Sequence, residues 1–159
     1  MAPADPSHVY IGTENGAFFR SLDGGNTWSD NLQSAVLPGF TITRIESSPL
    51  DANLLFITTA NFGTSHAFRS TDGGRQWEDV DRGQLPGVPH HALAIPPDRP
   101  QTVYVCNDAG VFVSPDLGGT WMSLTRNLPN VMIVDLVYHT HDRTLTVATY
   151  GLSLWRLAV

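Results

Sequence analysis

The stretch Ser21-Leu22-Asp23-Gly24-Gly25-Asn26-Thr27-Trp28 decides the fold, because it occurs three times in the chain. It returns as STDGGRQW over residues 70–77 and as SPDLGGTW over residues 114–121. Successive aspartates of this motif are 49 and 44 residues apart. A fixed period of this size indicates a repeat protein with one supersecondary unit per repeat.

Strand-like segments precede each motif. Two short runs of β-branched and aromatic residues flank a glycine-containing turn in HVYIGTENGAFFR, LLFITTANFGTSHAFR, TVYVCNDAGVFV and TLTVATYGLSLWR (residues 8–20, 54–69, 102–113 and 144–156). A further apolar run opens three of the repeats, as ITRIESSP, HHALAIPP and MIVDLVYH (residues 42–49, 90–97 and 132–139). Such alternation between turn signals is typical of half-buried strands.

Each repeat therefore contains up to four strands, which we name A (the apolar run), B and C (the pair) and D (from the motif tryptophan). The 159 residues predict an all-β fold of 14 strands, or about three and a half four-stranded antiparallel β-propeller blades. The blades are expected at residues 7–34, 41–82, 90–126 and 131–159 of a single propeller segment.

The motif has the chemistry of a tight turn between strands C and D. A short aspartate side chain accepts backbone N–H groups across a turn, and the serine hydroxyl adds another hydrogen bond. Glycine supplies the positive φ, and the tryptophan is expected to bury its ring between layers. The residues with this structural role are Ser21, Asp23, Gly25, Trp28, Ser70, Asp72, Gly74, Trp77, Ser114, Asp116, Gly118 and Trp121.

On these three motifs the chain resembles the Asp-box (BNR) propeller family, which includes sialidases, xyloglucan-cleaving glycosidases, sortilin receptors and a photosystem II assembly factor. The chain is similar to the C-terminal half of such propellers, and its final segment is similar to their C-terminal end, with Leu157 at the position of the box serine. The resemblance implies that the boxes lie on the face opposite the ligand site. It also implies a secreted or extracytoplasmic location, on which the sequence itself is silent.

Composition excludes several functions. The net charge is −6, and no basic patch for nucleic acid is visible. No apolar run approaches the length of a membrane helix. All nine basic residues are arginine, which removes lysine chemistry, and Cys106 lies alone in an apolar run, as expected for an inert buried thiol. The spacing of His139 and His141 implies no third ligand, so neither a metal nor another cofactor is indicated.

Strand direction places the B–C and D–A loops on the face opposite the boxes. Loops held by a rigid scaffold often carry binding residues, so this face is the candidate ligand surface. The B–C loops supply the candidates Phe62, His66, Asp108 and Tyr150. The alternative interpretation is that Phe62 only caps a blade.

Strand A is expected to line the central channel. Alignment of the three A strands makes Arg44, Ala92 and Asp135 equivalent, with Glu46, Ala94 and Val137 two residues further on. Arg44 then joins the ligand-binding candidates, and Glu46 with Asp135 suggests the paired carboxylates of a glycosidase. The alternative is that these charges neutralise one another in a hydrated channel.

Two functions follow. The first is a non-catalytic module that binds carbohydrate or protein through the B–C and D–A loops; the alternative is part of a glycoside hydrolase. Sialidase chemistry is disfavoured, since no Arg-Ile-Pro motif occurs and Arg20, Arg69 and Arg156 recur as repeat features. The open strand edges require a partner, which is either a second copy of the chain or a missing propeller half.

Overall fold

The computed structural model describes residues 1–37, 39–63, 65–124 and 128–159. Within these residues thirteen strands form four antiparallel sheets, and no helix long and apolar enough to cross a membrane is present. The strands are β1 (Val9–Gly12), β2 (Phe18–Ser21), β3 (Ile42–Ser47), β4 (Leu55–Thr59), β5 (Ala67–Ser70), β6 (Glu78–Asp79), β7 (His90–Ala94), β8 (Val103–Asn107), β9 (Gly110–Ser114), β10 (Met122–Ser123), β11 (Ile133–His139), β12 (Thr144–Thr149) and β13 (Leu154–Ala158).

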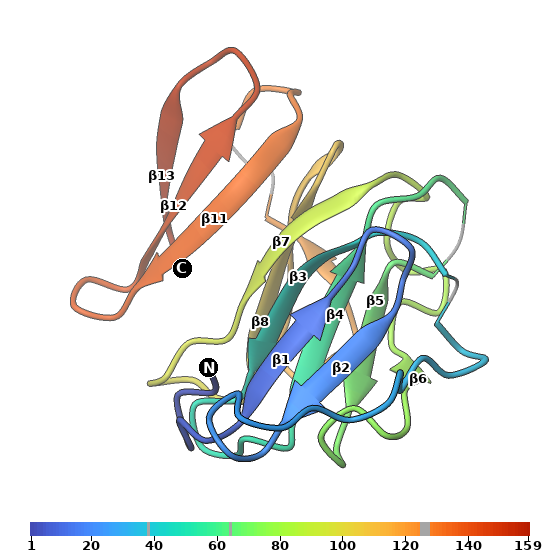
Figure 1. The fold of residues 1–159 in the computed structure, drawn as a ribbon. Helices are drawn as coiled ribbons and strands as arrows, with labels where there is room; N and C mark the ends of the chain where they lie inside the picture. Colours follow the sequence, from blue (N-terminus) through green and yellow to red (C-terminus); the bar gives the residue numbers. More distant parts are fainter. Residues whose placement is uncertain (38, 64, 125–127) are drawn as a thin grey trace.

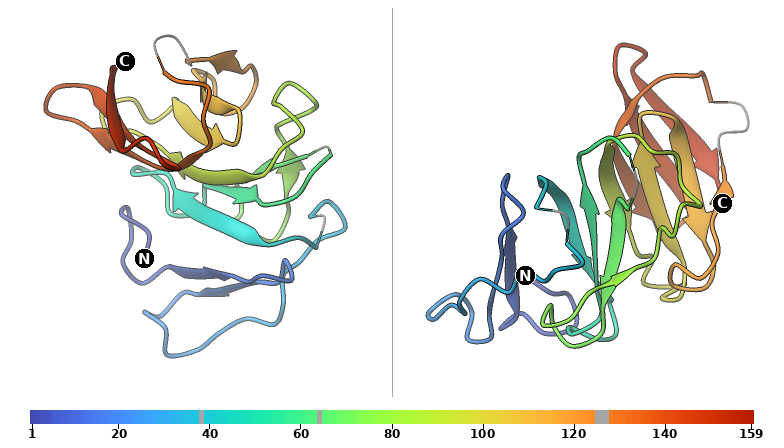
Figure 2. Two further views of the ribbon diagram at one scale, coloured as in Figure 1. Left: turned by 90° about the horizontal axis from the view of Figure 1, so that it is seen from above. Right: turned by 90° about the vertical axis from the view of Figure 1, so that its right-hand side faces the viewer.

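The sheets are β1-β2, β3-β4-β5-β6, β7-β8-β9-β10 and β11-β12-β13, and we call them blades 1 to 4. They follow one another in chain order, with blades 1 and 4 at the two ends of the row (Figures 1 and 2). The first strand of each sheet packs against the first strand of the next, through β1, β3, β7 and β11. This arrangement confirms the predicted all-β fold, a partial propeller. The predicted end of the third blade, residue 126, lies outside the described residues.

Blade 1 differs from the prediction of 14 strands, because its strand D does not form. The segment after the first box makes two backbone hydrogen bonds to β2, from Ser29 N to Arg20 O (2.9 Å) and from Leu32 N to Phe18 O (2.8 Å). The side chain of Asn31 accepts the Phe18 N–H at 3.0 Å. The Asn31 side chain thus takes an N–H group that strand D would bond through its backbone, so no regular ladder develops.

The three boxes have the same hydrogen bonds. In each, the serine Oγ accepts the N–H of the glycine four residues later at 2.7–2.8 Å and donates to the aspartate Oδ1. The aspartate Oδ1 in turn accepts the N–H of the residue before the tryptophan, at 2.8–2.9 Å. The predicted turn chemistry is confirmed.

The box tryptophans pack against the preceding blade. Trp77 meets Phe18 of blade 1 edge to face, with ring centroids 5.1 Å apart, and it is 6% exposed. Trp121 donates its indole N–H to Val80 O of blade 2 at 2.8 Å. Trp28, on blade 1, has no earlier sheet to pack against and is 41% exposed, so the predicted burial fails for this ring.

Candidate functional site

The B–C and D–A loops adjoin one another at one end of the sheets, at the top of Figure 1. Each B–C loop is bonded to the segment that enters its own sheet. These bonds run from Ala60 N to Thr41 O (3.0 Å), from Asp108 N to Pro89 O (3.3 Å) and from Tyr150 N to Met132 O (2.9 Å). The predicted loop positions Pro38 and Thr64 lie outside the described residues. Both sets of loops therefore lie at the same end of the sheets, and we call this end the rim.

Two of the predicted binding residues are the most exposed aromatic side chains of this rim. Phe62, between β4 and β5, is 76% exposed, and Tyr150, between β12 and β13, is 74% exposed. Phe40 and Leu152, which the loop analysis did not single out as candidates, are also exposed there. Large apolar side chains displayed to solvent on separate loops are what a contact surface needs.

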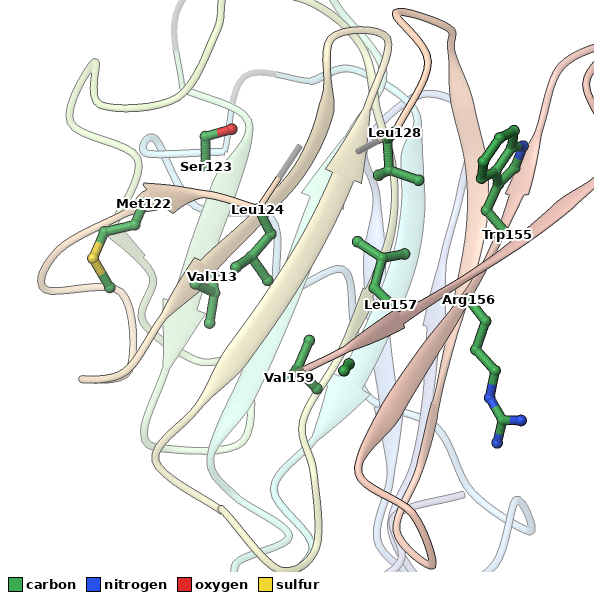
Figure 3. A pocket seen from close by; sticks show the side chains of 10 residues that line it. Val113, Met122, Ser123, Leu124, Leu128, Trp155, Arg156, Leu157 and Val159 are labelled. Carbon is green, nitrogen blue, oxygen red and sulfur yellow. The ribbon is translucent and has the colours of Figure 1, made fainter. Parts of the chain in front are cut away.

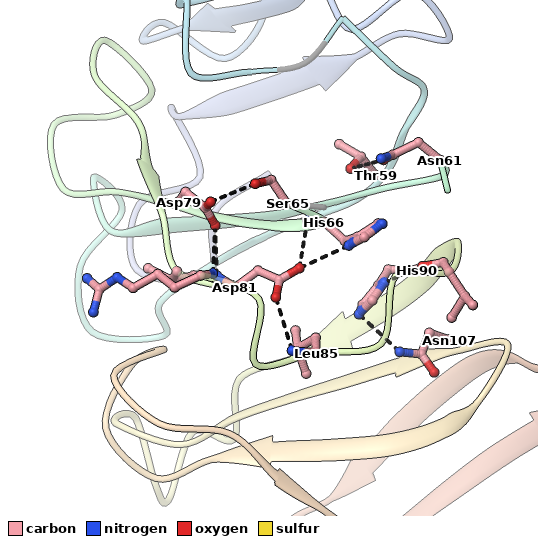
Figure 4. A network of polar contacts seen from close by, with 12 residues as sticks. Thr59, Asn61, Ser65, His66, Asp79, Asp81, Leu85, His90 and Asn107 are labelled. Carbon is pink, nitrogen blue, oxygen red and sulfur yellow. Dashed lines mark hydrogen bonds and ion pairs between the residues drawn. The ribbon is translucent and has the colours of Figure 1, made fainter. Parts of the chain in front are cut away.

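His66, also predicted as a ligand contact, lies beneath the rim instead. Its side chain has no exposed surface, and its Nδ1 lies 2.9 Å from Oδ2 of Asp81 (Figure 4). The other Asp81 oxygen accepts the Leu85 N–H at 3.0 Å. Burial alone would raise the pKa of Asp81, but these hydrogen bonds outweigh it and the pKa is lowered. His66 thus anchors the D–A loop that starts at Asp81.

His90 continues this network into blade 3. Its ring stacks on that of His66 with centroids 4.8 Å apart, its Nδ1 donates to Val88 O at 2.8 Å, and its Nε2 accepts from the Asn107 amide at 3.1 Å. Burial lowers the pKa of His90 to about 4. The network fixes the loop backbone from beneath.

Asp108, another predicted contact, is half-buried and bonded to His91, with Oδ1 2.7 Å from Nε2. His91 sits at a β-bulge of β7, between His90 and Ala92. The same bulge occurs in β3, between Ile42 and Arg44, and in β11, between Ile133 and Asp135. Bulges at one repeat position re-aim the residues that follow them.

Those following residues are the predicted equivalent set Arg44, Ala92 and Asp135. Arg44 of blade 2 forms an ion pair with Asp135 of blade 4. Ala92 takes the same position on β7, the strand between them, where its small side chain leaves room for the pair to meet. Asp135, one of the two carboxylates considered for catalysis, is therefore paired with an arginine that lies two blades away.

Glu46 lies two residues from Arg44 on β3 and is the second predicted carboxylate. Burial raises its pKa, the nearby guanidinium of Arg44 opposes that shift, and the charge of Asp135 adds to it. Glu46 borders a hollow of about 90 Å³ that Asp135 does not line. The two predicted carboxylates therefore do not line a common hollow.

A larger cleft, of about 460 Å³, opens between blades 3 and 4 (Figure 3). Its lining is mostly apolar and includes Val113, Leu124, Leu128, Trp155, Leu157 and Val159. It lies beside β13, the last strand of a sheet that has three strands in place of four. Among the residues that the structure describes, no three His, Cys, Asp or Glu side chains gather in a way that would hold a metal ion.

Several known proteins are similar to this chain. A curated relative, a probable oligoxyloglucan-reducing end-specific xyloglucanase of Neosartorya fischeri, is 28% identical over 89 residues, which are 55% of this chain and 10% of the relative. Among solved structures, the GH74 enzyme of Niastella koreensis superposes with a TM-score of 0.77 at 21% identity, over 100% of this chain and 28% of the enzyme. YCF48 bound to D1 peptide superposes with a TM-score of 0.66 at 17% identity, over 96% of this chain and 52% of YCF48.

The two solved structures share the propeller fold with this chain, which spans about half of YCF48 and smaller parts of the GH74 enzyme and the curated relative. The family model described as photosynthesis system II assembly factor YCF48 matches residues 1–151, which include all three boxes and strands β11 and β12 of the boxless fourth blade. The chain therefore belongs to the YCF48 family of Asp-box β-propellers.

Proposed function

We propose that the chain is a non-catalytic binding module that takes an extended segment of another protein on the rim of B–C and D–A loops. The observation that carries the proposal is the exposure of Phe62 and Tyr150 there, on loops that hydrogen bonds hold to their neighbours. Aromatic side chains on a fixed backbone give large contact areas at low entropic cost, which favours peptide binding.

The charged residues near the rim support binding in preference to hydrolysis. A retaining or inverting glycosidase needs two carboxyl groups facing one cleft, roughly 5–10 Å apart. Asp135 is engaged by Arg44, and Asp108 by His91, so each of these carboxylates already has a cationic or hydrogen-bonding partner. A D1 peptide is the partner of the similar YCF48 structure, which makes a peptide the first ligand to test.

The experiment measures binding of the D1 peptide, and of a random peptide library, to the full chain by titration calorimetry or display. We expect Phe62→Ala and Tyr150→Ala each to weaken binding by about tenfold, the size of an interface hot spot. Leu50→Ala is the matched control, because Leu50 is 72% exposed on an A–B loop at the other end of the sheets. Peptide binding that survives both rim substitutions would overturn the proposal.

Part of a glycoside hydrolase is the second candidate. The raised pKa of Glu46 beside the charge of Asp135 favours it, since such enzymes need one protonated and one ionised carboxyl group. Release of sugar from xyloglucan oligosaccharides, lost in Glu46→Gln and in Asp135→Asn, would favour this candidate over the first. We expect no turnover, because the Arg44 ion pair occupies Asp135.

A further inference from the structure

Successive blades are joined by two contacts from strand C to the next box. In the first, Phe18 of β2 packs on Trp77, and a Cβ on Gly74 would lie 2.2 Å from the Phe18 ring. In the second, Nη1 of Arg20 donates to the carbonyl oxygens of Asp72 and Gly73, both at 3.1 Å. Strand C thus offers an apolar side chain and, two residues later, an arginine.

The arginine contact recurs between blades 2 and 3. Nη1 of Arg69, on β5, donates at 3.0 Å to the carbonyl oxygen of Leu117, which stands in the third box where Gly73 stands in the second. Blade 3 has Val113 at the arginine position, and the blade that follows has Leu157 in place of a box serine. Strand C therefore has an arginine at this position when the next blade has a box, and blade 3, which is followed by the boxless blade 4, has a valine there.

Blade 4 has the arginine again. Leu154 and Arg156 of β13 stand where Phe18 and Arg20 stand in β2, and Leu154 is 67% exposed. Arg156 uses its Nε and Nη2 for Thr144 and Asp142 of its own blade, while Nη1 has no partner among the described residues. By the pattern of blades 1 and 2, this strand offers its side chains to a further box.

Blade 1 presents the complementary surface. A Cβ on Gly73 would lie 2.7 Å from Arg20, whereas a Cβ on Gly24, the same position in the first box, meets nothing within 4 Å. The ring of Trp28 is exposed, although its counterpart Trp77 is buried. The first box thus lacks the strand C contacts that cover the second and third boxes.

We propose that a second copy of this chain docks head to tail, with the first box of one copy on β13 of the other. Trp28 packs on Leu154, and Arg156 donates through Nη1 to the carbonyl oxygens of Asp23 and Gly24. When each copy places its first box on β13 of the other copy, the two equivalent contacts close a ring. The chain spans 52% of YCF48, so two copies have about the length of one such chain, which favours a closed pair over a longer assembly.

Light scattering on the purified full chain tests this proposal. We expect a particle of twice the 17.3 kDa chain mass. A tail variant, Leu154→Asp with Arg156→Glu, and a head variant, Trp28→Asp, are each expected to weaken self-association by about tenfold or more. The matched control is Leu50→Asp with Arg82→Glu, which changes an exposed leucine and an exposed ion-paired arginine of blade 2, away from both surfaces.

Mixing distinguishes head-to-tail docking from symmetric pairing of two β13 edges. The tail and head variants together retain one intact contact per pair, and we expect the mixture to form heterodimers that neither variant forms alone. A head variant that dimerises as well as the original chain contradicts the proposal, as does a monomeric original chain at high concentration. Circular dichroism of each variant establishes that the fold is retained.

Discussion

The imidazole ring of His90 stacks on that of His66 at a centroid distance of 4.8 Å, and the two rings come from different blades. Both side chains are fully buried. Their stacking joins β7 to the loop after β4, and it holds the titratable ring of His90 where water does not reach. The stability of this junction is therefore sensitive to protons.

Acid is expected to destabilise the fold through His90. Its pKa is about 4 when folded, against 6.5 for the free side chain, so the unfolded chain binds the proton more readily. The stability is fully present above about pH 6.5 and falls as the pH drops toward 4; below that, loss of the Asp81 charge continues the trend. Urea unfolding across this range measures the effect. His90→Gln should flatten the slope, and the exposed His141→Gln should leave it unchanged.

Glycines in equivalent box positions should differ in their tolerance of a methyl group. Both Gly25 and Gly74 have positive φ, 96° and 87°, so alanine strains the backbone by about 1–2 kcal/mol at either site. A Cβ on Gly74 also collides with Phe18, whereas one on Gly25 meets only the Trp28 ring, at an ordinary contact distance of 3.8 Å. Gly74→Ala is therefore expected to cost a further ~1–3 kcal/mol. Equal midpoints in thermal unfolding of the two variants would contradict the packing between blades 1 and 2.

Removal of the Arg20 guanidinium is expected to destabilise the fold by about 1–3 kcal/mol, because the carbonyl oxygens of Asp72 and Gly73 lose their donor at a contact between blades. Arg75→Ala is the control. Arg75 is an exposed residue of the same box whose backbone N–H alone is bonded, and its substitution should change stability by less than about 0.5 kcal/mol. Denaturant midpoints of the two variants decide the matter.

Cys106 is expected to resist alkylation in the folded protein. Burial in the core between blades 3 and 4 raises the pKa of its thiol to about 12, and the side chain has no exposed surface. Iodoacetamide at pH 8 should label the chain only after unfolding, as mass spectrometry would show. Rapid labelling of the native protein would mean that this core opens.

Local chemistry made the box turns predictable, since serine, aspartate and glycine act within a few residues of one another. Burial was less predictable, because it depends on neighbours distant in sequence. His66 was expected at the surface, yet Asp81, fifteen residues away, draws it inward. Trp28 has the same motif as Trp77 but lacks the preceding sheet that covers the latter. The Arg44–Asp135 pair spans 91 residues, yet alignment of the A strands already made the two residues equivalent and allowed their charges to neutralise one another.

The residue at the arginine position of strand C matches the blade that follows, since arginine stands there when the next blade has a box. A tandem duplicate of residues 41–82 inserted after blade 2 would meet Arg69 on one side and present Arg69 to the third box on the other, so it finds both of its contacts. The same duplicate placed after blade 3 would meet Val113 and leave its box carbonyls unbonded. Gene duplication in such a chain can therefore lengthen the array at some junctions and not at others.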